Sequence, residues 1–215
     1  MAIFNSALFK GISGCVGNVI TYKLGKRQIA RGKPGFINDA KTEKQLKQRT
    51  KIRTITKLRR NFVSTLKVGY CTSSGKECAN RFIQDNVQKV NADDLSFPTI
   101  DLLTLSLSGG NLQIPLIAAE VDEENRLVIF HWEKQPLMPF MAKDDRLMGT
   151  ILEREEQKSR LIELGFRGES GEKRWTPPTD WNMKQLTVYG FAVSKNGKNA
   201  STTLGLIETK ERDIK

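Results

Sequence analysis

Three glycines near the N-terminus, Gly11, Gly14 and Gly17, recur at every third position, and this spacing suggests anion chemistry. Backbone N–H groups next to glycine can cradle a phosphate. A dinucleotide-binding fingerprint, however, places GxGxxG between a strand and a helix. This GxxGxxG precedes an extended segment, so the helix N-terminus that would hold the phosphate is missing. Besides an anion cradle, two interpretations stay open: a flexible linker, or an apolar arm, including Asn18, whose glycines let another backbone come close. We favour the arm, because its other residues are mainly small or apolar.

Cations form the second set of candidate residues. Residues 1–90 contain 19 Lys and Arg against four Asp and Glu, whereas residues 91–215 contain 16 against 20. A basic half of this kind predicts an anionic partner, which is either nucleic acid or the acidic half of a neighbouring copy. No helix-turn-helix, zinc finger or RNP motif accompanies these cations, so base-specific recognition is not predicted. The cations that we assign to anion or partner binding are Lys23, Lys26, Arg27, Arg31, Lys47, Arg49, Lys51, Arg53, Lys57 and Arg60.

Groups that could perform catalysis are sparse. His131 is the only histidine and alternates with Phe130 and Trp132, a pattern typical of a structural residue on a strand. The carboxylates of residues 122–124 and 153–156 lie in turn-like or charge-rich segments, as solvated groups do. Three cysteines without a CxxC pair do not supply the four ligands of a zinc site. We therefore predict no catalytic residue, no metal and no cofactor, which indicates that the protein is not an enzyme.

The N-terminal elements that position the glycines and cations fall into two regions. Residues 1–37 are expected to form a glycine-rich arm and a β-hairpin that turns around Gly25. Residues 38–92 are expected to form a basic helical region, in which the Thr42–Gln45 segment resembles a capping box. Apolar residues at helical spacing then lead to a helix end at Gly69, and a second, shorter helix follows.

The remaining residues, 93–215, read as short strands separated by turn signals. A hairpin is predicted at residues 122–125, and Asn196-Gly197 is a strong turn signal. Seven short strands in this length predict an immunoglobulin-like or fibronectin-like β-sandwich, with Trp132 and Tyr189 in its core. The fold class predicted for the whole chain is mainly β with an N-terminal α/extended part. The predicted strands cover residues 100–110, 112–121, 126–132, 146–153, 159–166, 185–193 and 201–208.

Several short motifs follow one another along the chain in a familiar order. They are GxxSGxVGNV (Gly11 to Val19), Arg31 followed by Pro34, TExQxxQR (Thr42 to Arg49), Gly69-Tyr70, Ser108-Gly109-Gly110, Trp132 and VYxF (Val188 to Phe191). With these motifs the chain resembles a Bacteroidota family that is defined by a domain of unknown function. It departs from that family at Ala40-Lys41, where Asn-Pro is usual. The glycine-rich segment and the TxxQ helix are also similar, more loosely, to small structural proteins of tailed phages. The resemblance implies a fold but no activity.

Three functions remain in consideration. The first is a non-enzymatic structural protein that self-assembles as a homo-oligomer, for example in a phage virion, with the N-terminal arm and basic helix making the subunit contacts. The second is sequence-independent binding of nucleic acid through residues 23–60, and the third is a surface or adhesion module. No apolar run is long enough for a transmembrane helix, and the N-terminus lacks the basic region of a secretory signal. The expected location is therefore a virion or the cytoplasm.

Overall fold

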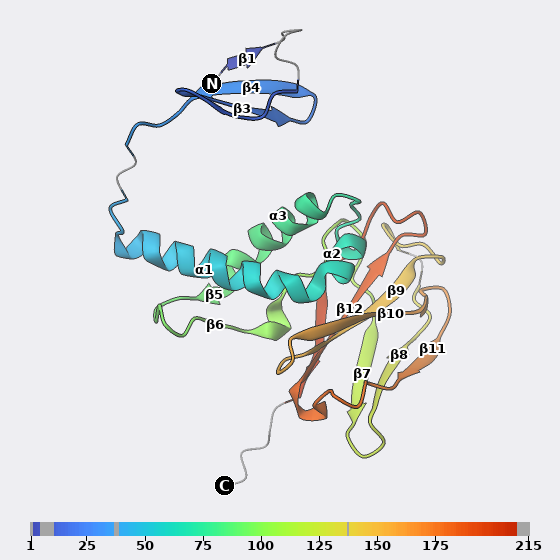
Figure 1. The fold of residues 1–215 in the computed structure, drawn as a ribbon. Helices are drawn as coiled ribbons and strands as arrows, with labels where there is room; N and C mark the ends of the chain where they lie inside the picture. Colours follow the sequence, from blue (N-terminus) through green and yellow to red (C-terminus); the bar gives the residue numbers. More distant parts are fainter. Residues whose placement is uncertain (1, 5–10, 37–38, 137, 210–215) are drawn as a thin grey trace. The chain divides into compact units, whose positions relative to one another are not determined.

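The computed structural model describes residues 2–4, 11–36, 39–136 and 138–209 (Figure 1). The chain divides into two compact units, Met1–Thr42 and Glu43–Lys215. The described part of the first unit is built from strands, and the second unit combines helices with several antiparallel sheets. The fold is therefore mixed α/β, whereas the sequence predicted a mainly β chain with an N-terminal α/extended part.

The first unit is a four-stranded antiparallel sheet with the order β1-β4-β3-β2. Leu24 pairs with Arg27 across a two-residue turn, which confirms the predicted hairpin at Gly25. A second tight turn occurs at Gly17-Asn18, because Val16 pairs with Val19. The segment that was expected to be an arm thus contributes the two short strands β1 and β2 to this sheet, and residues 5–10 of the predicted arm lie outside the described residues. The strands are β1 (Ala2–Phe4), β2 (Gly14–Val16), β3 (Val19–Leu24) and β4 (Arg27–Gly32).

The second unit begins with the helical region that the apolar spacing predicted. Its first helix reaches Gly69 as expected, but a 3-10 turn at Arg60–Phe62 interrupts it. Ser74 caps the later helix, because its hydroxyl oxygen accepts a hydrogen bond from the Glu77 backbone N–H at 3.4 Å. Phe82 on this helix is fully buried. The elements are α1 (Glu43–Arg59), η1 (Arg60–Phe62), α2 (Val63–Gly69), α3 (Gly75–Asn86) and η2 (Val87–Lys89).

The strands of the second unit form three antiparallel sheets. Their orders are β10-β9-β12-β13, β11-β8-β7 and β5-β6. The paired strands β7 and β8 flank the predicted turn at residues 122–125, and Gly197 has a φ of 66° in the turn between β12 and β13. Both turn predictions are confirmed. The elements are β5 (Val90–Asn91), β6 (Thr99–Ile100), η3 (Leu102–Thr104), β7 (Ile117–Asp122), β8 (Leu127–Trp132), β9 (Arg146–Glu153), β10 (Lys158–Phe166), β11 (Gly171–Trp175), η4 (Met183–Gln185), β12 (Leu186–Val193) and β13 (Leu204–Glu208).

The predicted strand at residues 100–110 is wrong beyond Ile100. Asp101 starts a 3-10 turn by accepting a hydrogen bond from the Leu103 backbone N–H at 3.1 Å. The Ser106 and Leu107 backbone N–H groups donate to side chains instead of a neighbouring strand: they bond the Asn86 side-chain oxygen at 2.8 Å and the Thr203 hydroxyl at 2.9 Å. Strand β11 was missed because Gly171–Trp175 is mostly charged and contains one apolar side chain, Trp175.

The four-stranded sheet of the second unit is covered on both faces. All eight residues of β12 are buried, and successive side chains pack on opposite faces of the sheet. Val188 packs with Phe130 and other residues of the three-stranded sheet. Tyr189, the next residue, packs with Phe62 of the helical region. The second unit therefore has three layers. The four-stranded sheet is the middle layer, with the helices on one face and the three-stranded sheet on the other.

Some glycines of this chain lie in close contact with a neighbouring backbone segment, but they are not the N-terminal glycines that the sequence suggested. A Cβ built on Gly69 would lie 2.3 Å from the Leu107 carbonyl oxygen, and one on Gly110 would lie 2.4 Å from the Ala200 carbonyl oxygen. The Gly109 N–H also donates to the Gly69 carbonyl oxygen at 3.2 Å. Two of the motifs that carry the family resemblance, Gly69-Tyr70 and Ser108-Gly109-Gly110, thus meet at the end of α2. At Gly69 and Gly110 only glycine fits.

Candidate functional site

The N-terminal glycines shape the first unit through their backbone angles. Gly11, Gly14 and Gly17 have φ values of 87°, 135° and 56°. These lie in the region that favours glycine, and a Cβ added at any of the three would meet no atom within 4 Å. Asn18 occupies the turn, and its carbonyl oxygen accepts the Lys33 N–H at 2.7 Å. Within the described chain, these glycines therefore serve the strand and turn conformation and do not accommodate a neighbouring backbone.

One face of the N-terminal sheet is rich in apolar side chains. The register aligns Ile3, Ile29 and Tyr22 in one row across β1, β4 and β3, and Leu24 lies two residues farther along the same face of β3. Ile29 is the one buried side chain among the described residues of this unit, at 3% exposed, while Ile3 and Leu24 are 63% and 58% exposed. A unit of about 40 residues rarely buries enough apolar surface to be stable alone. This face is therefore incompletely covered.

The four predicted cations of the first unit lie on its central hairpin and are exposed. Arg27 and Arg31 share the face of Ile29, since they alternate with it along β4. Lys23 lies on the opposite face of β3, and Lys26 lies in the turn. The hairpin therefore places two guanidinium groups beside the apolar face.

The predicted cations of the second unit lie on α1 and at Arg60, so they belong to a different compact unit from those on the hairpin. Lys47 forms ion pairs with Glu43 at 2.9 Å and Asp93 at 3.5 Å. The hydrogen bond and charge of Glu43, followed by those of Asp93, raise the pKa of Lys47 above its usual value. Lys47 is thus already compensated. Arg49 also has an interaction partner.

Four of the predicted cations keep an uncompensated charge. Among the described residues, no ion pair involves Lys51, Arg53, Lys57 or Arg60. Three of these side chains are exposed, and that of Lys51 is half-buried. Because like charges along a helix repel one another, the end of α1 and the start of η1 favour the approach of an anionic group.

The groups considered for catalysis have structural partners. The Nδ1 atom of His131 lies 3.5 Å from an oxygen of Glu172 on the neighbouring strand β11. Asp122 accepts two hydrogen bonds from Asn125, at 3.0 and 2.7 Å, and these bonds lower its pKa. The expectation that Glu153 is solvated is wrong: it is fully buried and accepts the backbone N–H of Glu155 at 3.1 Å.

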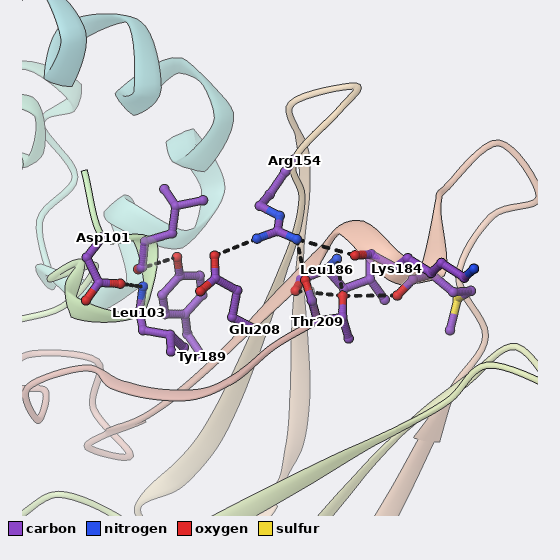
Figure 2. Close-up of polar contacts among 10 residues, drawn as sticks. Asp101, Leu103, Arg154, Lys184, Leu186, Tyr189, Glu208 and Thr209 are labelled. Atoms are coloured by element: carbon purple, nitrogen blue, oxygen red, sulfur yellow. Dashed lines mark hydrogen bonds and ion pairs between the residues drawn. The ribbon is translucent and has the colours of Figure 1, made fainter. Parts of the chain in front are cut away.

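Sequence reasoning missed a polar network between β9, β12 and β13 (Figure 2). The Arg154 guanidinium pairs with Glu208 at 2.5 Å and donates to the backbone carbonyls of Lys184 and Thr209. The Tyr189 hydroxyl donates to the Leu102 carbonyl oxygen at 2.7 Å. Burial is the main cause that raises the pKa of Tyr189 above its usual range. Arg154 and Glu208 are 54 residues apart, so no local pattern signals their pairing.

A second missed cluster is buried at the other end of β9 and β10. Arg167 and Asp145 are 2% and 1% exposed, and the Arg167 Nε atom lies 3.4 Å from an Asp145 carboxylate oxygen. The guanidinium also donates to the Gln135 side-chain oxygen at 2.9 Å and to the Gln113 carbonyl oxygen at 2.7 Å. Burial lowers the pKa of Arg167, and the charge of Asp145 opposes that shift. This arrangement ties three segments together and is structural.

Comparison with known proteins identifies the family. The model of a family of unknown function, DUF6266, matches residues 11–206, so the chain belongs to this family. The match covers most of the chain, in agreement with the resemblance to a domain of unknown function. No curated protein matches the sequence. Among the described residues, no helix has the length and apolar character needed to cross a membrane.

Proposed function

We propose that this protein is a non-enzymatic structural protein that self-assembles through its N-terminal sheet. The observation that carries the proposal is the incompletely covered apolar face around Ile29, with Ile3 and Leu24 well exposed. A sheet of four short strands needs another surface against such a face. The unit also contains seven Lys and Arg but one carboxylate, whereas residues 91–215 have more carboxylates than cations.

The partner that fits this face best is the acidic strand region of a second copy. Arg27 and Arg31 on the same face would repel their own counterparts in a symmetric contact, but they complement carboxylates. Contacts of this head-to-tail kind generate rings or open filaments. A phage virion or a similar particle is the setting that we propose for such an assembly.

At the level of architecture, we propose that β7–β13 constitute an immunoglobulin-like or fibronectin-like sandwich. The seven strands divide into sheets of three and four, and side chains from both sheets share one core that includes Trp132. Immunoglobulin constant-type domains divide seven antiparallel strands in the same numbers. The helical layer on the outer face of the four-stranded sheet is an addition to that plan.

Self-association is tested with the Leu24→Asp variant. A leucine buried at a contact contributes about 1.5–3 kcal/mol, so the substitution is expected to weaken self-association at least about tenfold. Sedimentation velocity over a range of protein concentrations at low salt measures the effect. The matched control is Val63→Asp, which introduces the same charge at a 52% exposed valine of the helical layer and should associate as the wild type does. A wild-type protein that stays monomeric at high concentration and low salt contradicts the proposal.

The second candidate function is sequence-independent binding of nucleic acid, and the uncompensated cations of α1 favour it. The logarithm of the binding constant falls linearly with the logarithm of the salt concentration. Removing one cation that neutralises a phosphate makes this slope shallower by about one unit. The double variant Lys51→Ala/Arg60→Ala is therefore expected to bind random DNA more weakly and with a smaller slope, as fluorescence anisotropy would measure. The control is Arg160→Ala/Lys173→Ala, which removes two exposed cations from β10 and β11. Absence of wild-type binding at about 50 mM salt, where such interactions are strongest, excludes this candidate.

A further inference from the structure

A cavity of about 360 Å³ lies beneath α1, entirely within the second unit. Arg53 and Lys57 of α1 form one wall, Ile100 and Leu102 form another, and Arg154 closes it at the end of β9. The volume is within the lower range of cavities that bind small molecules. Arg154 belongs to the network of Figure 2, so a hydrogen-bonded side chain at the end of β9 borders the cavity.

The charged side chains that line this cavity favour an anionic ligand. Its described lining contains three cations and no Asp or Glu. Glu208 compensates Arg154, whereas Arg53 and Lys57 form no ion pair among the described residues. Two positive charges on adjacent turns of α1 therefore remain at the cavity wall, and they favour a ligand with a negative head.

Two residues that line the cavity each have a buried side-chain nitrogen with no hydrogen-bond partner among the described residues. These atoms are the Asn61 side-chain nitrogen and the Arg154 Nε atom. Buried N–H groups are nearly always hydrogen-bonded in folded proteins, and leaving one unpaired is costly. Both groups donate, so each would be satisfied by an acceptor oxygen, and a carboxylate or a phosphate offers such oxygens next to this wall.

The remaining lining is apolar, and it distinguishes this cavity from a site for a free inorganic ion. Leu58, Ile100, Leu102 and Leu152 contribute hydrocarbon surface to it. An apolar body placed against these side chains would be removed from water. We infer that the cavity binds a small amphiphilic anion, a carboxylate or phosphate monoester attached to a short apolar chain. This site is independent of the proposed self-association.

Isothermal titration calorimetry of the full chain with four probes tests the inference: octanoate, octyl phosphate, octylammonium and inorganic phosphate. Octanoate or octyl phosphate is expected to bind at least about tenfold more tightly than octylammonium and inorganic phosphate. The tighter of the two amphiphiles identifies the head group. Octylammonium binding equal to that of the anions, inorganic phosphate binding equal to that of octyl phosphate, or no binding of either amphiphilic anion overturns the inference.

Variants on α1 locate the site. Arg53→Gln/Lys57→Gln is expected to weaken binding of the preferred amphiphile about tenfold or more, because charged hydrogen bonds contribute about 1.5–3 kcal/mol each. Lys44→Gln/Lys51→Gln removes the same charge from the same helix outside this cavity and should leave the affinity unchanged. Unchanged thermal melting would show that both variants are folded. Equal affinities of the two variants would overturn the assignment of the site.

Discussion

Phe62→Ala is expected to lower the free energy of unfolding by about 3–5 kcal/mol, the usual cost of emptying a buried phenylalanine site. Phe62 is fully buried where the helical layer meets the central sheet. Its ring lies 6.1 Å from that of Tyr189 on β12 and 6.4 Å from that of Phe82 on α3. The substitution therefore weakens the packing of the helical layer both against the sheet and within itself.

Urea denaturation of the full chain measures this effect, with far-UV circular dichroism for the helices and tryptophan fluorescence for the strands. The control is Val63→Ala, which shortens the adjacent exposed side chain and should cost less than about 1 kcal/mol. Because the helices and the central sheet share one core, both signals should change together in the second unit. A helical transition separate from that of the strands would contradict the shared core.

Asp145→Ala is expected to cost a similar amount, about 3–5 kcal/mol, because it leaves the buried charge of Arg167 without its partner. The Asp145 carboxylate also accepts the Ala142 backbone N–H at 2.9 Å, and the substitution removes this bond too. Guanidinium denaturation measures the change. Solvent cannot compensate the unpaired charge of Arg167, because this side chain, like that of Asp145, is almost completely buried.

The double variant Asp145→Leu/Arg167→Met separates the effect of charge balance from that of packing. Replacing both members of a buried ion pair by apolar residues is often nearly neutral. The double variant should therefore be more stable than Asp145→Ala, with strong non-additivity between the two positions. A double variant that is less stable than Asp145→Ala would show that the hydrogen bonds to Gln135 and Gln113 contribute more than the ion pair does.

The glycine-rich segment shows that one glycine spacing can have more than one physical cause. Regular spacing at Gly11, Gly14 and Gly17 correctly indicated a special backbone. The expected cause was close approach by another backbone, but within this chain the cause is positive φ at a strand and a tight turn. Close approach is instead the reason for Gly69 and Gly110, which a fixed spacing does not mark because their neighbours come from distant parts of the chain.

Local sequence determined the elements whose stability is local. The turn at Gly25 and the Asn196-Gly197 turn depend on residues that adopt positive φ. The helix end at Gly69 and the burial of Phe82 follow from spacing along one helix face. The strands β8, β9, β10 and β12 were also predicted close to their observed bounds, because apolar segments between turn signals indicate strands.

Tertiary structure decided which of these elements share a core. Residues 101–109 have the composition of a strand, but Asn86, Thr203 and Gly69 accept the backbone N–H groups of Ser106, Leu107 and Gly109, so no strand ladder forms. The edge strand β11 takes its conformation from pairing with β8 and has little apolar pattern of its own. The cavity beneath α1 and the Arg154–Glu208 pair likewise join residues that are distant along the chain. The sequence by itself therefore determined the turns, helices and charge distribution, whereas the sheet order decided which side chains meet, because strand pairing brings together residues with no local relation.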